Sequence, residues 1–139
     1  MKRLFKILIA SLLLLTSCDA PTEIEISKAW SRPAQQGENG VIYFLLQNHS
    51  GNADELIGIT SDVAETVEIH ESSMEGDVMQ MRQVSSVPID ANENVEFEPG
   101  GYHVMLIKLK KDLKPGEEIQ VTLQFKNHED TPLNVSVHE

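Results

Sequence analysis

Short apolar runs separated by turn-forming residues occupy most of the chain after its first 25 positions. Alternation of apolar and polar positions is typical of strands with one buried face. It is clearest in Ile119–Phe125, where apolar residues recur at every second position. We predict strands at Val41–Gln47, Leu56–Thr60, Thr66–His70, Val78–Gln83, Val95–Phe97, His103–Leu109, Ile119–Phe125 and Leu133–Val137.

Turn signals such as Lys114-Pro115-Gly116 lie between these runs, and no helical stripe is longer than about two turns. Seven to nine short strands in roughly 120 residues predict one all-β domain, an antiparallel two-sheet sandwich. A closed barrel is the alternative, because alternation alone does not distinguish the two architectures.

The chain begins with features of an export signal. Three basic residues, Lys2, Arg3 and Lys6, precede the apolar run from Ile7 to Leu15. This run is shorter than the roughly 20 apolar residues that a membrane-spanning helix needs. Its length and its basic flank predict a secretory signal peptide, which we exclude from the fold.

The apolar run leads into Leu15-Thr16-Ser17-Cys18, which resembles the lipobox of bacterial lipoproteins. We therefore expect a signal peptide at 1–17, acylation of Cys18, a tether at 18–25 and a folded domain at 26–139. The mature protein would be anchored to the outer face of the cytoplasmic membrane, the periplasmic side in a Gram-negative cell. Because Cys18 is the only cysteine, no internal disulfide can form.

The net charge of the mature chain excludes some classes of binding partner. Cleavage before Cys18 would remove three of the 11 basic residues, leaving 8 against 22 acidic ones and a net charge of −14. Such a domain lacks the basic footprint that nucleic acid requires. It also lacks a second, electrostatic attachment to anionic lipid.

Candidate metal ligands gather between His70 and Met105. His103 and Met105 are two residues apart in one predicted strand, so their side chains share a face, and Met81 follows His70 after ten intervening residues. Thioether and imidazole together favour copper(I) over zinc, calcium or magnesium. The alternative is structural, since a methionine in a strand is usually a core residue.

Two further methionines lie in the same segment. Met79 is two residues before Met81, and we interpret it as packing near the site or as an alternative thioether ligand. Met74 falls in the expected loop before that strand, where it could help to capture the ion. Both are auxiliary candidates only.

The spacing His70, ten residues, Met81, twenty-one residues, His103-x-Met105 resembles the signature of the periplasmic copper chaperones called PCuAC. Neighbouring segments are similar too, including the words at 29–33, 43–48, 76–82, 99–106 and 113–116. The resemblance covers nearly the whole mature chain. It departs in its lipobox and in lacking the His- and Met-rich tail of some relatives.

The resemblance implies a cupredoxin-like or immunoglobulin-like sandwich that binds one Cu(I) per chain through His70, Met81, His103 and Met105. It also implies delivery of copper to the CuA or CuB centre of a haem-copper oxidase, alongside Sco-type proteins. We expect a monomer.

Other functions remain open at this point. Copper sequestration for tolerance would use the same ligands, and a metal-free structural sandwich would use none of them. An electron-transfer copper site would need a cysteine thiolate, which the mature domain lacks apart from Cys18. We expect no enzymatic activity, since no nucleophile elbow, phosphate loop or metal-hydrolase motif is present.

Overall fold

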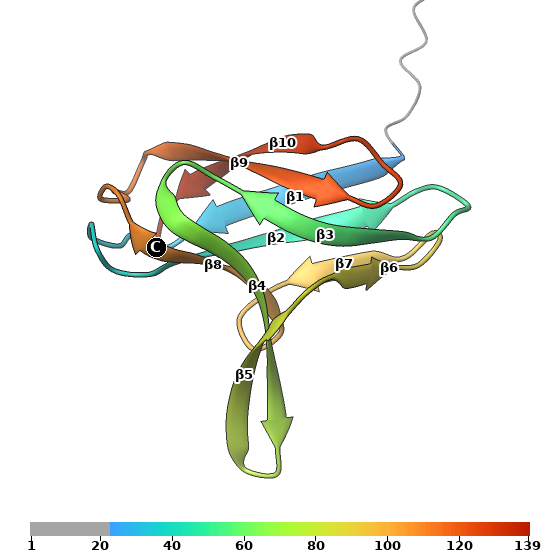
Figure 1. Ribbon diagram of the computed structural model, residues 1–139, viewed down its shortest axis with the longest axis horizontal. Coiled ribbons are helices and arrows are strands. Elements are labelled where there is room, and N and C mark those ends of the chain that lie inside the picture. Colours follow the sequence, from blue (N-terminus) through green and yellow to red (C-terminus); the bar gives the residue numbers. More distant parts are fainter. Residues whose placement is uncertain (1–22) are drawn as a thin grey trace, which may run out of the picture.

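The computed structural model describes residues 23–139, so the expected signal peptide and Cys18 lie outside the described residues. Within this range there are ten strands and no helix (Figure 1). The strands are β1 Ile24–Ser31, β2 Gly40–Asn48, β3 Asp54–Thr60, β4 Ala64–Glu75, β5 Val78–Val84, β6 Val87–Ile89, β7 Asn94–Phe97, β8 Tyr102–Leu109, β9 Glu118–Phe125 and β10 Thr131–Val137.

All eight predicted strands are present, together with β1 and the three-residue β6. One boundary was wrong in a way that affects the site. We expected a strand to end at His70, but β4 continues to Glu75. The extension contains Ser72 and Ser73, which have weak strand preference. Pairing with β5 stabilises this extension, because cross-strand pairing influences strand formation more strongly than intrinsic propensity does.

The all-β prediction is confirmed, but the strands form one mixed sheet instead of two separate antiparallel ones. Their order is β5-β4-β8-β7-β2-β1-β10-β9-β3-β6, with an additional pairing of β8 to β2. Two pairs, β1 with β10 and β7 with β8, are parallel. The sheet folds over itself into a sandwich, with β9 and β10 in one layer and β2 and β8 in the other (Figure 1). Its end strands, β5 and β6, do not pair with each other, so the sheet is no closed barrel.

The core lies between the layers and comes from residues 24–137. Alternate residues of the strands enter it, as the pattern of β9 predicted: Ile119, Val121, Leu123 and Phe125 are all buried. Leu106 of β8 and Ile42 of β2 face them and are fully buried. This stretch therefore supplies a hydrophobic core of its own, as a folded domain does.

A hairpin projects from the sandwich at the end of β4 (Figure 1). Residues 64–71 of β4 pair with β8, whereas 72–75 pair only with β5. We call the free two-stranded part, residues 72–81, the arm. Gly76 has φ +63° and lies in the two-residue turn between the paired Glu75 and Val78. The chain enters β1 on the far side of the sandwich from the tip of the arm (Figure 1).

Candidate metal centre

His70 and His103 form a direct cross-strand pair at the base of the arm. Their ring centroids are 5.8 Å apart, with an angle of 54° between the planes. His103 is 4% exposed, and the side chain of His70 is 16% exposed. These residues are 33 positions apart in sequence and are brought together by the antiparallel register of β4 and β8.

Each ring uses one nitrogen and leaves the other without a partner. His103 Nδ1 lies 3.1 Å from the carbonyl oxygen of Gly101, and His70 Nε2 lies 2.7 Å from Glu68 Oε2. Because a carbonyl and a carboxylate only accept hydrogen bonds, these two nitrogens carry the protons. In the neutral form of each ring, the lone pair is then on His103 Nε2 and on His70 Nδ1.

Both lone-pair nitrogens are buried and have no hydrogen-bond partner. They are the only such side-chain atoms among the described residues. Leaving a buried polar atom unsatisfied costs about 1–3 kcal/mol, so two in adjacent rings call for an explanation. Metal-ligating histidines commonly donate their other N–H to a carboxylate or a backbone carbonyl, as these rings do. The arrangement fits an ion bound between them.

Met105 and Met81 lie on the same sheet face as the two histidines. Met105 is two residues from His103 on β8, pairs with Glu68 across the ladder, and is half-buried. Met81 of β5 pairs with Ser72, so it lies diagonally across from His70, and it is 57% exposed. The structure thus brings the two histidines together. It places one thioether on β8 and one on β5, the two strands that flank β4.

Met74 was expected in a loop, and this prediction was wrong. It belongs to β4 and pairs directly with Met79 of β5. Both side chains share the face of Met81 and are strongly exposed, Met74 at 59% and Met79 at 62%. Neither packs in the core, so the core interpretation of these methionines does not apply.

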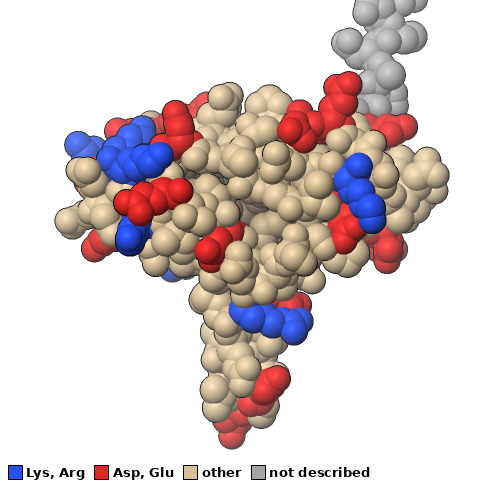
Figure 2. Space-filling view, viewed as in Figure 1, with Lys and Arg blue, Asp and Glu red and all other residues tan. Residues whose placement is uncertain are grey.

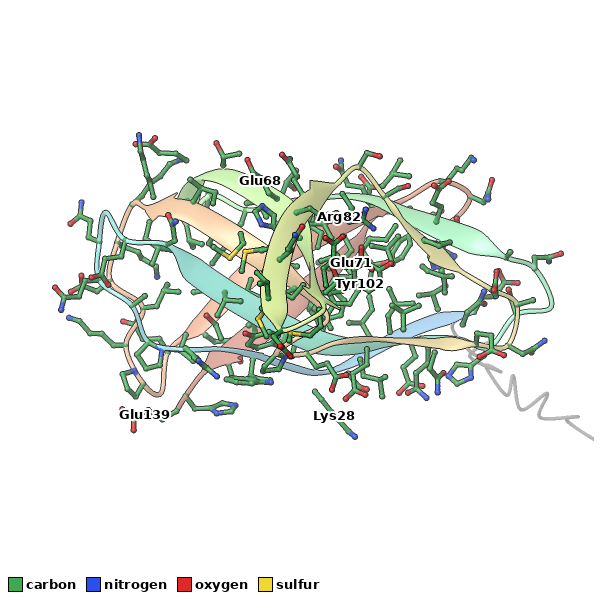
Figure 3. The ribbon with its side chains drawn as sticks, turned by 90° about the horizontal axis from the view of Figure 1, so that it is seen from below. Lys28, Glu68, Glu71, Arg82, Tyr102 and Glu139 are labelled. Carbon is green, nitrogen blue, oxygen red and sulfur yellow. The ribbon has the colours of Figure 1, made fainter. Side chains whose placement is uncertain are left out.

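The opposite face of the arm's base carries a separate polar cluster. Arg82 donates two hydrogen bonds to Glu71 Oε2, at 3.0 Å from Nε and 2.6 Å from Nη2. Figure 3 shows Glu71, Arg82 and Tyr102 together on one side of this base, apart from Glu68. The hydrogen bond to Glu71 raises the pKa of Arg82. Burial raises the pKa of Tyr102, and the charge of Glu71 adds to this. The cluster joins β4, β5 and β8 where the arm begins.

Sequence reasoning missed Glu68 and the Gly101 carbonyl. Glu68 could have been found because it lies two residues before His70 and so shares its face in any strand. The Gly101 contact depends on the backbone conformation before β8, and no sequence pattern indicates it.

The remaining histidines lie away from this pair. His49 contacts Glu25 at 3.0 Å, His138 stacks on Trp30, and His128 lies edge-on to Phe125. In the part of the chain that the structure describes, no group of three or more His, Cys, Asp or Glu side chains could hold a metal ion. A metal site in this part of the chain would need other donor groups, and the thioethers of the methionines near His70 and His103 could supply them.

Across residues 23–139 we also find no helix with the length and apolar character that crossing a membrane requires.

The fold and site define a cupredoxin-like β-sandwich with a His/Met face. Residues 24–137 match the family model described as "Putative lipoprotein LpqE-like". The chain therefore belongs to the LpqE-like lipoprotein family. This assignment supports export with a lipid anchor.

Two proteins are similar to this chain in sequence over most of its length. The protein RP573 of Rickettsia prowazekii is 34% identical over 123 residues, which cover 85% of this chain and 68% of the relative. "Putative lipoprotein Lxx21020" of Leifsonia xyli is 32% identical over 117 residues, which cover 84% of this chain and 70% of the relative.

Several solved structures that resemble this chain are PCuAC domains. The copper-bound PCuAC domain from PmoF2 has a TM-score of 0.71 and 25% identity, covering 83% of this chain and 92% of that domain. The copper(I) form of DR1885 from Deinococcus radiodurans has a TM-score of 0.63 and 23% identity, covering 84% of this chain and 80% of that one. The sequence-based resemblance to PCuAC is confirmed. None of these descriptions indicates a catalytic family.

Proposed function

We propose that this chain is an exported copper(I) chaperone, anchored through acylated Cys18, that carries one Cu(I) per monomer. His70, Met81, His103 and Met105 are the proposed ligands, and the acceptor is the CuA or CuB centre of a haem-copper oxidase, reached directly or through a Sco-type protein. The observation that carries the proposal is the pair of buried imidazole nitrogens without partners at His70 and His103.

The donor set suits copper(I) as cargo. Two neutral imidazoles and two neutral thioethers match a soft, filled-shell ion, which accepts three or four ligands without a rigid geometry. Likeness to a copper-bound PCuAC domain at 25% identity supports the same choice of metal. In the oxidising environment outside the cytoplasm, thioethers also avoid the disulfide exchange that would consume thiolates.

The exposure of the ligands supports transfer by ligand substitution. Met81 is 57% exposed, whereas His103 is 4% exposed. An acceptor's stronger ligands would reach the weakly held thioether of Met81 first and the imidazoles last.

The first test is anaerobic titration of the mature domain, residues 19–139, with Cu(I) against a competing chromophoric chelator. We expect tight one-to-one binding that the His103→Ala/Met105→Ala variant loses, because it removes one imidazole and one thioether from the same face. His128→Ala, which removes a histidine far from the site, is the matched control. Binding that persists in the double variant would contradict the proposed site.

The transfer route is tested separately with Met81→Ala. We expect weaker Cu(I) binding and an altered rate of Cu(I) transfer to a soluble CuA domain, followed by its absorption spectrum. If affinity and transfer rate were both unchanged, the thioether-first route would be excluded, although the histidine site would stand.

A further inference from the structure

The arm exposes three methionines on one face. Among residues 23–139, five large apolar side chains are strongly exposed, and four of them lie on the arm: Met74, Val78, Met79 and Met81. In β5, every residue from Val78 to Gln83 is exposed. A methionine that fills a core is buried, so packing does not account for this cluster.

The strand register brings the three sulfurs within reach of one another. Met74 lies directly opposite Met79, and Met81 lies opposite Ser72 on the same face. The Cβ atoms of a directly opposed pair are about 4.5–5.5 Å apart. Residues two apart on a strand are separated by about 6.6 Å. Three flexible thioether side chains over this span can converge on one ion.

We propose that Met74, Met79 and Met81 form an outer Cu(I) site that receives the ion before the His70–His103 pair does. The inference rests on the proposed chaperone function and assigns the arm a role in loading. Figure 2 shows the arm largely uncharged along its length, with acidic side chains near its tip. Glu75 and Asp77 lie at or beside the turn and favour the approach of a cation.

Met81 connects the two sites. It lies diagonally across from His70 and in the same strand as Met79, so it can ligate an ion in either position. Moving the ion inward exchanges the sulfurs of Met74 and Met79 for His70 Nδ1 and His103 Nε2. Copper remains Cu(I) throughout, and no covalent bond is made or broken. Two imidazoles hold the ion more firmly than two thioethers, which gives the movement its direction.

An exposed apolar patch is also what a protein-docking surface looks like. Three of the four exposed residues carry sulfur, and this composition favours a metal-binding role. Substitution by leucine separates the two functions, because leucine keeps the apolar surface and removes the donor atom.

The direct test uses the His70→Ala/His103→Ala variant of residues 19–139 with ¹³C-methyl methionine, titrated anaerobically with Cu(I). We expect the methyl resonances of Met74, Met79 and Met81 to shift together as one equivalent binds. Adding Met74→Leu and Met79→Leu should abolish binding at this site. Unshifted Met74 and Met79 resonances in a folded variant would overturn the proposal.

A kinetic test keeps both histidines. The Met74→Leu/Met79→Leu variant should retain wild-type Cu(I) affinity but load from a chelator roughly tenfold more slowly. Val78→Ala, on the same arm but without sulfur, is the matched control and should load at the wild-type rate. Unchanged loading in the leucine variant would overturn the outer site alone. Absence of tight Cu(I) binding in the wild type would instead contradict the proposed chaperone function.

Discussion

The position of one proton determines which side of His103 can bind a metal. Its Nδ1 lies 3.1 Å from the Gly101 carbonyl, so in the neutral ring the lone pair is on Nε2, which is buried and has no hydrogen-bond partner. Glu68 fixes the tautomer of His70 in the same way, by accepting a hydrogen bond from Nε2. Contacts of this kind fix the tautomer and orientation of a ligand before the metal arrives. Glu68 and the Gly101 carbonyl are therefore positioning groups in the proposed site.

Glu68→Ala should weaken Cu(I) binding about 10–100-fold, the range for loss of a carboxylate that supports a metal-bound histidine. Competition with a chromophoric chelator measures the affinity, and ¹⁵N NMR of the imidazoles reports the tautomer of His70. Glu65→Ala is the control, since Glu65 lies on the same strand, is exposed and forms an ion pair with Lys108 at 3.5 Å instead of with a histidine. Equal affinities in the two variants would show that Glu68 has no positioning role.

The candidate ligands could be named from the sequence because their side-chain chemistry and spacing are distinctive. Glu68 was missed because the chain contains 22 acidic residues and most are ordinary surface groups, although its spacing from His70 places both side chains on one face of the strand. The pairing of His70 with His103 also required the structure. It depends on the β4–β8 register, and a shift of one residue would send these side chains to opposite faces.

At the scale of elements, the arm is the least supported part of the sheet. Residues 72–75 of β4 have a neighbouring strand on one side only, and the outer edge of β5 is unpaired. Two-stranded hairpins are marginally stable by themselves. The bonds between Arg82 and Glu71 hold its base, and Gly76 permits its turn. The β4 half of the arm could not be predicted from propensity, because Ser72 and Ser73 gave no strand signal, whereas the β5 half was predicted.

Gly76→Ala should destabilise the arm without affecting the sandwich. A Cβ at this position would meet no atom within 4 Å, so the cost arises from the φ of +63° alone. A left-handed conformation costs a non-glycine residue about 1–2 kcal/mol. Hydrogen exchange should show faster exchange of the β5 amides, with an unchanged midpoint of thermal unfolding.

Gly51→Ala provides the matched control for that experiment. Gly51 also has open space around it, but its φ is outside the left-handed region. If both variants exchanged at the same rate in β5, backbone strain at Gly76 would not control the arm.

At the scale of the whole molecule, stability and metal binding reside in different residues. The core comes from the buried faces of the sandwich, whereas the proposed ligands lie on the other face of β4 and β8 and on the arm. Because of this separation, substitutions of the exposed ligands leave the core contacts that stabilise the fold in place.

Leu106→Ala should therefore lower the free energy of unfolding by about 2–5 kcal/mol, because Leu106 is fully buried. Met81→Ala should change it by no more than about 0.5 kcal/mol, as expected for an exposed side chain. Urea denaturation of the metal-free domain measures both. A large loss of stability in the Met81 variant would mean that this residue packs against the fold.

The chain enters β1 on the far side of the sandwich from the arm (Figure 1). With the proposed anchor at Cys18, five residues separate the lipid from Glu23, which corresponds to a reach of at most about 18 Å. The domain would then search for its acceptor in two dimensions, with its loaded end turned outward at a nearly constant height. An acceptor in the same membrane would need its copper entrance at that height above the bilayer. The length of the tether would therefore limit which acceptors the domain can reach.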